Sequence, residues 1–123
     1  MKLISMDIEA YRNYCLSKKE VTEEFPFDDT TLVYKVMGKI FTITDIDHFE
    51  SINVKCDPAT AIQLREAYEG VSPGYHMNKR HWNTVLTDGT IPDQLLYQWI
   101  DDSYKLVMAK LSKADRKMLE EEA

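Results

Sequence analysis

Hydrophobic positions at the start of the chain follow a helical period. Ile8, Tyr11 and Cys15 recur at helical spacing, which predicts an amphipathic helix over residues 7–18. The residues that follow are less regular, and Pro26 excludes a simple helix there. A pair of aspartates then marks a turn. The pattern therefore predicts one helix followed by an irregular connection.

Strand-like patterns come next, over residues 31–37, 40–46 and 51–56. The last of these alternates cleanly and places Ile52, Val54 and Cys56 on one face. Gly38 and Lys39 lie between the first two strands, and Gly38 is predicted at the first central position of a type II′ turn. We therefore expect three strands in an antiparallel meander.

A second helix and two more strands are predicted further along. Asp57 and Pro58 form a strong helix start, and Gly70 closes that helix. The two strands are predicted over residues 71–77 and 82–87. Residues 78–81 connect them and are expected to be exposed at a loop tip.

The last predicted helix begins at Pro92. Its buried face is expected to contain Leu96, Trp99, Ile100, Ser103 and Val107. Residues 113–123 are expected to fray. The order α-β-β-β-α-β-β-α predicts a single α+β domain over residues 1–123, with an antiparallel sheet and helices packed mainly on one face.

Composition adds limits to this picture. Hydrophobic residues make up 44% of the chain, which is enough for a core that needs neither disulfides nor metal. Cys15 and Cys56 are far apart and match no zinc or redox spacing, so both are interpreted as core thiols. No apolar run resembles a signal peptide or a membrane span. We therefore expect a soluble cytoplasmic protein without membrane contact.

Charge is distributed unevenly along the chain. The formal net charge is −6, which argues against broad, charge-driven nucleic-acid binding. The segment over residues 73–85 contains no acidic residue, however. It contains two cations, Lys79 and Arg80. They lie among four planar side chains, those of Tyr75, His76, His81 and Trp82. Such groups suit phosphate, carboxylate or nucleobase recognition, so an anionic ligand is expected to meet this segment.

Short runs along almost the whole chain also carry a family resemblance. They cover residues 15–16, 23–27, 32–36, 38–39, 55–58, 64–66, 88–89 and 103–107, with the strongest block at 70–85. Through these runs the chain resembles the MmcQ/YjbR family of small bacterial proteins. The resemblance implies a compact YjbR-like α+β fold, sometimes described as a double wing. It also implies a DNA-binding role.

A nucleic-acid hypothesis follows from the basic residues. Lys79 and Arg80 would contact phosphates, and Lys39 at the first hairpin tip would be a further contact. Lys35 and Lys55 could add to them, depending on which faces of the sheet they occupy. The competing interpretation is that Lys79 and Arg80 are ordinary solvated loop residues.

Planar residues of the same segment allow two interpretations. His81 and Trp82, with His76, could stack on bases or hydrogen-bond to them. Alternatively, Tyr75 and His76 could belong to a small-molecule site in which Arg80 holds a carboxylate or phosphate. A histidine could then act as acid or base. Structural roles compete with both, since Trp82 also suits a core position and His76 lies within a strand pattern.

Other chemistry finds little support in the sequence. Nothing places a base beside Cys56, and neither a glycine-rich phosphate loop nor a nucleophile-elbow motif occurs. Asp45, Asp47 and His48 form an incomplete ligand set that is more typical of a solvated turn. We therefore expect no enzymatic activity, no cofactor and no metal.

A protein-interaction role is the last alternative. A small acidic α+β domain with a basic edge could dock a partner protein through that edge or through an unpaired strand. The sequence does not separate this role from nucleic-acid binding.

Overall fold

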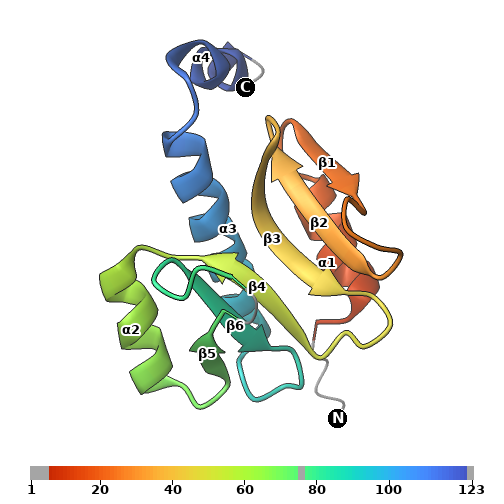
Figure 1. The fold of residues 1–123 in the computed structure, drawn as a ribbon, viewed down its shortest axis with the longest axis vertical. Helices are drawn as coiled ribbons and strands as arrows, with labels where there is room; N and C mark the ends of the chain where they lie inside the picture. Colours follow the sequence, from red (N-terminus) through yellow and green to blue (C-terminus); the bar gives the residue numbers. More distant parts are fainter. Residues whose placement is uncertain (1–5, 75–76, 122–123) are drawn as a thin grey trace.

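The computed structural model describes residues 6–74 and 77–121. The chain begins with α1 (Ile8–Leu16), β1 (Val21–Glu24), β2 (Thr31–Val36), β3 (Lys39–Asp45) and β4 (Ser51–Lys55). It continues with α2 (Pro58–Ala67), β5 (Val71–Pro73), β6 (Trp82–Leu86), α3 (Asp93–Ala109) and α4 (Lys113–Glu121) (Figure 1). The strands pair antiparallel in the order β1-β2-β3-β4-β6-β5. The predicted α+β class is confirmed.

Helices α1, α2 and α3 cover one face of this sheet. α1 packs on β1, α2 on β5 and β6, and α3 crosses β3 and β4 (Figure 1). The hydroxyl groups of Tyr11 in α1 and Thr42 in β3 hydrogen-bond at 2.9 Å. On the same face, the Asn83 amide of β6 donates to the Ala61 carbonyl of α2 at 3.2 Å. The apolar core fills the space between these layers.

The α3 face predicted from the sequence is confirmed, because Leu96, Trp99, Ile100, Ser103 and Val107 are all buried. They meet a sheet face that contributes its largest fully buried side chains from Tyr34, Phe41 and Ile52, among others. Burial of each such side chain contributes about 1.5–3 kcal/mol to stability. Through this contact, α3 holds the neighbouring strands β3 and β4 on a single helix.

Ser103 lies where β3 and β4 separate. Their ladder ends at the Thr42–Val54 pair, so Phe41 and Lys55 would form the next pair. Instead, the Lys55 amide donates to the Ser103 hydroxyl at 2.8 Å, and that hydroxyl donates to the Phe41 carbonyl at 2.5 Å. The serine therefore satisfies both backbone groups and holds the two strands apart.

β1 is an element that the sequence pattern did not predict. Its four residues pair with β2 along the sheet edge, with Glu23 opposite Tyr34. The Arg12 guanidinium donates to both Glu23 carboxylate oxygens at 2.9 Å, and the Tyr34 hydroxyl donates to one of them at 2.5 Å. Polar contacts from α1 and β2 therefore fix a strand that has little apolar pattern of its own.

α4 corrects the expectation of fraying for residues 113–121, whereas the last two residues of that expectation lie outside the described residues. Over Lys113–Glu121 the chain forms a helix, and Leu119 is buried with only 4% of its surface exposed. Leu119 belongs to the same apolar cluster as Leu111 and Val107. This single anchor among charged residues explains why the segment looked unstructured in the sequence.

The β2–β3 turn also differs from its prediction. The two central residues are Met37 and Gly38, with φ values of 48° and 83°, as in a type I′ turn rather than type II′. Lys39 is consequently the first residue of β3 and pairs with Val36. The register shifts after the Tyr34–Thr42 pair, which leaves a bulge at Phe41. The hairpin is therefore bent near its tip.

Candidate functional site

The connection between β5 and β6 carries the cations predicted to bind phosphate. Lys79 and Arg80 are exposed, as expected. Asn78 organises the turn: its side-chain oxygen accepts from the Arg80 amide at 2.9 Å, and its carbonyl accepts from the amides of His81 and Trp82 at 3.1 and 3.0 Å. Lys79 and Arg80 take part in none of the ion pairs between described residues. The turn thus presents two uncompensated cations to solvent.

Arg65 of α2 ties this connection to the body of the fold. Its Nε donates to the Asn83 side-chain oxygen at 2.7 Å, and its Nη2 donates to the carbonyls of Lys79 and, at 3.3 Å, Trp82. Gly74 adds a second constraint, since a Cβ there would lie 2.7 Å from the Trp82 Cβ. The connection is therefore held from inside as well as within its own turn.

Trp82 corrects one site prediction. It is 9% exposed and forms the start of β6, so it packs within the fold and cannot offer its ring to a base. His81 is half-buried, and its carbonyl accepts from the Cys56 amide at 2.7 Å, which fastens the turn to the end of β4. Tyr75 and His76, the predicted small-molecule residues, lie outside the described residues, as does that part of the strand expected over 71–77.

A second basic feature lies where β3 and β4 separate. We call it the lysine groove: an open groove of about 440 Å³ lined by Lys35, Lys39, Ile40, Lys55, Val107 and Lys110. Lys35 pairs with Glu24 at 3.1 Å. No ion pair within the described parts of the chain includes Lys39, Lys55 or Lys110. Three uncompensated cations therefore share one groove.

The electrostatics of Lys55 reflect this crowding. Partial burial, followed by the nearby cations Lys110 and Lys39, lowers the pKa of Lys55 below its ordinary value. Both effects act against the charged form of the side chain. An anion in the groove would act in the opposite direction and stabilise the ammonium group.

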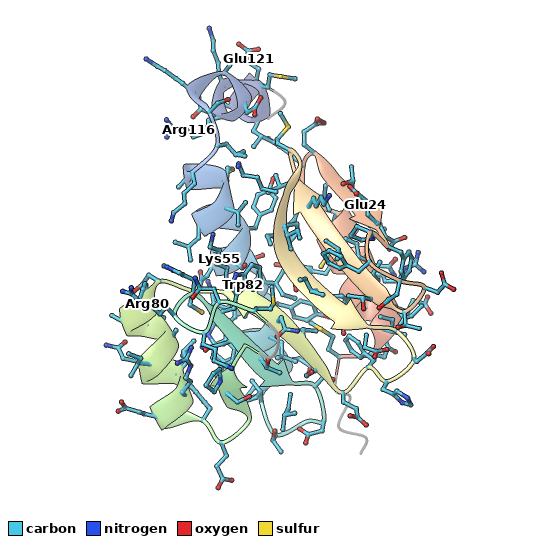
Figure 2. All side chains as sticks on the ribbon, in the orientation of Figure 1. Glu24, Lys55, Arg80, Trp82, Arg116 and Glu121 are labelled. Atoms are coloured by element: carbon cyan, nitrogen blue, oxygen red, sulfur yellow. The ribbon has the colours of Figure 1, made fainter. Side chains whose placement is uncertain are left out.

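The lysine groove and the β5–β6 turn meet at the end of β4. Lys55 pairs with Trp82 across the β4–β6 ladder, and the next residue along β4 bonds to His81. Figure 2 shows Lys55, Trp82 and Arg80 on the α2 side of the molecule, with Glu24 on the other. The backbone of the β5–β6 turn is thus joined to the strand end that carries Lys55.

A cleft of about 350 Å³ between α2 and α3 adjoins the same lysine. Lys55, Leu64, Trp99 and Lys105 are among the residues that line it. Cys56 also lines the cleft, but burial raises the pKa of its thiol to about 11, so at neutral pH it is not the thiolate that a nucleophile requires. The cleft therefore offers binding space without an activated nucleophile at this cysteine.

Asp45, the residue considered for a metal site, has a local structural role. Its side-chain oxygen accepts from the amides of Asp47 at 2.8 Å and His48 at 3.3 Å. Such an arrangement is typical of an aspartate turn. No group of three metal-ligating side chains was found over residues 6–74 and 77–121.

In the same part of the chain, no helix is long and apolar enough to span a membrane.

Comparison with known sequences and structures places the chain among relatives. The sequence pattern of the YjbR family matches residues 16–106. The chain belongs to the YjbR family. It is 30% identical over 115 residues to YjbR of Escherichia coli K12, covering 93% of this chain and 98% of that one. It is 38% identical over 94 residues to YbdF of Escherichia coli O157:H7, covering 76% and 77% of the two chains. Neither name states an activity.

A solved structure of a similar protein supports the fold of this chain. The crystal structure of Deinococcus radiodurans protein DR2400, described as a DUF419 domain, superposes with a TM-score of 0.88. The two chains are 39% identical, and the match covers 97% of this chain and 91% of that one. The architecture is therefore shared, whereas function has to be argued from the side chains of this chain.

Sequence reasoning missed two residues of this surface. Lys110 lies at the end of α3 and reaches the groove only through the packing of that helix. Arg65 is a polar residue on an otherwise apolar face of α2, and the sequence pattern did not predict its inward donor contacts. The only sequence signal for the contacts of Arg65 was the presence of a cation on the buried side of a helix.

Proposed function

We propose that this YjbR family chain binds DNA through its basic surface, with Lys79 and Arg80 of the β5–β6 turn as the leading phosphate contacts. Lys39 and Lys55 extend this surface toward the β2–β3 hairpin. His81 contributes by fastening the turn to β4, and Trp82 supports it from within. A role on DNA would also place the chain in the cytoplasm of a bacterial cell.

One observation supports the proposal most: the turn that presents the two cations is already ordered. Asn78 closes the turn, and Arg65 holds its carbonyls from the opposite side. Binding a phosphate then requires ordering of the Lys79 and Arg80 side chains but not of the backbone, which reduces the entropic cost of association. Among the described residues, neither cation has a carboxylate partner that it would first have to leave.

The acidity of the chain shapes the expected affinity. With a net charge of −6, most of the surface repels a polyanion, so DNA should approach only through the basic surface. A few phosphate contacts give modest affinity that falls steeply with salt. We therefore expect binding at low ionic strength that weakens toward physiological salt.

The first test is fluorescence anisotropy with labelled mixed-sequence DNA, duplex and single-stranded, across a salt series. The Lys79→Ala/Arg80→Ala pair should weaken binding and reduce the slope of log affinity against log salt by about 2, since each lost phosphate contact contributes roughly 0.9. Lys113→Ala/Lys117→Ala is a matched control, because it removes the same charge from exposed positions on α4. Absence of native binding at low salt, or an equal effect of both pairs, would contradict the proposal.

The α2–α3 cleft supports a second candidate, binding of a small molecule. Trp99 and Leu64 give it apolar walls, Lys55 and Lys105 give it ammonium groups, and Asp57 and Asp102 give it carboxylates. A small amphipathic molecule that carries both an anionic and a cationic group fits this combination. In a thermal-shift screen, stabilisation by such compounds that Lys105→Ala abolishes would support the cleft, and stabilisation unaffected by that change would exclude it.

A further inference from the structure

The lysine groove owes its existence to the separation of β3 from β4. The hairpin supplies Lys39, the end of β4 supplies Lys55, and the end of α3 supplies Lys110. These three elements are distant in sequence and are brought together by the packing of α3 across the sheet. The groove is therefore a product of the tertiary fold and not of a basic run in the sequence.

All charged side chains among the described residues that line the groove are cationic. Lys35 has Glu24 as its partner, whereas the other three lysines have no ion-pair partner in the described parts of the chain. Burial is the main cause of the lowered pKa of Lys55, and the nearby cations Lys110 and Lys39 lower it further, so gathering like charges here adds a cost in free energy. In a chain rich in carboxylates, leaving this cost uncompensated is informative, since a bound anion would remove it.

The lining also indicates which anion fits. Ammonium groups are compact point charges that suit the oxygens of a phosphate group. Ile40 and Val107 provide an apolar wall, and a groove of about 440 Å³ has room for a phosphate with a substituent. None of the described lining residues carries a carboxylate, which disfavours a cationic ligand, and none is aromatic, which disfavours stacking.

We infer that the lysine groove is a phosphate-binding site in which Lys39, Lys55 and Lys110 hold the phosphate oxygens from three sides. The phosphate can belong to a nucleic-acid backbone or to a free phosphorylated compound. In the first case the inference rests on the proposed function, and it names the groove as the place where the backbone is held beyond the β5–β6 turn. In the second case it is independent of DNA.

The test uses inorganic pyrophosphate and labelled single-stranded DNA as separate probes of the full chain. Pyrophosphate binding is measured by isothermal titration calorimetry at low salt, and DNA binding by anisotropy. The groove pair is Lys39→Ala/Lys110→Ala, because both side chains are exposed and their removal should leave the fold intact. The α4 pair Lys113→Ala/Lys117→Ala serves as the matched control for charge, because both side chains are exposed and have no assigned binding role. Circular dichroism confirms folding of each variant.

We expect the native chain to bind pyrophosphate and the groove pair to lose about tenfold or more in affinity, with the α4 pair unchanged. Pyrophosphate binding of this kind without DNA binding supports the groove and overturns the DNA proposal alone. DNA binding that the groove pair weakens, without pyrophosphate binding, supports the groove and identifies a nucleic-acid backbone as the source. The inference is overturned when the groove pair weakens neither probe more than the α4 pair does.

Discussion

Glu23 shows how one carboxylate can fix an edge strand. It accepts from the Arg12 guanidinium and from the Tyr34 hydroxyl, and these contacts join α1, β1 and β2. The Arg12 hydrogen bonds are the main reason that the pKa of Glu23 lies below its ordinary value of 4.5. The ionised form is therefore the one that the folded chain stabilises.

The Glu23→Gln variant should lose about 1–2 kcal/mol of stability at pH 7, because an amide accepts fewer and weaker hydrogen bonds than a carboxylate. A lowered folded pKa gives stability that is complete above the unfolded value and is lost as the pH falls through the folded value. The difference between native chain and variant should thus be constant near neutrality and shrink below about pH 4.5.

Urea denaturation at a series of pH values from 7 to about 3 measures this difference. Glu66→Gln is a suitable control, because Glu66 is exposed and takes part in none of the ion pairs or side-chain hydrogen bonds of residues 6–74 and 77–121. A stability difference that stays equal at all pH values would show that ionisation of Glu23 contributes nothing.

At the scale of elements, the β5–β6 turn depends on a side chain from α2. Arg65→Ala removes the donors that the Asn83 side chain and the Lys79 carbonyl use. We expect a loss of about 1–3 kcal/mol in stability, since the side-chain oxygen of the buried Asn83 loses its part-buried hydrogen bond. Amide exchange at residues 79–83 should accelerate, and DNA affinity should fall although both surface cations remain. Arg65→Lys keeps the charge without the planar donor pair, and full retention of exchange protection in that variant would contradict the role.

The elements differ in how well the sequence could predict them. α3 was predictable down to its buried residues, because a long amphipathic period survives in any tertiary context. β1 was not, because its four residues lack an alternating pattern and are fixed by polar contacts from Arg12 and Tyr34. The turn type was missed because Met37, a non-glycine residue, adopts a positive φ. Such a conformation carries no sequence signal.

The candidate site was likewise only partly predictable from the sequence. Exposure of Lys79 and Arg80 followed from a polar segment between two strands. The burial of Trp82 and the approach of Lys110 to Lys55 depend on tertiary packing, which no local pattern encodes. Sequence therefore indicated the sign of the charge at the site but not its geometry.

At the scale of the whole molecule, the sheet consists of two parts that share α3. The pairing between them is limited to the ladder from Thr42–Val54 to Thr44–Ile52. Beyond that ladder, the Ser103 hydroxyl is the link between the Phe41 carbonyl and the Lys55 amide. The stability of the fold thus depends partly on one small polar side chain in the core.

Ser103→Ala should destabilise the fold by about 1–3 kcal/mol, because it leaves a buried carbonyl and a part-buried amide without their partner. Urea denaturation measures this loss, and Ser72→Ala on the exposed part of β5 serves as the control. Equal stability of both variants would mean that β3 and β4 close to pair directly. In that case the lysine groove should narrow, and pyrophosphate affinity should change in the Ser103→Ala chain.

The same serine has a consequence for ligand choice. The Ser103 hydroxyl lies between the strands that carry Lys39 and Lys55. It therefore acts as a spacer that sets the width of the lysine groove. A side chain one carbon larger or smaller at this position would alter the distance between cations that it never touches. The size of the anion accepted could thus be retuned from the core, with every lysine left in place.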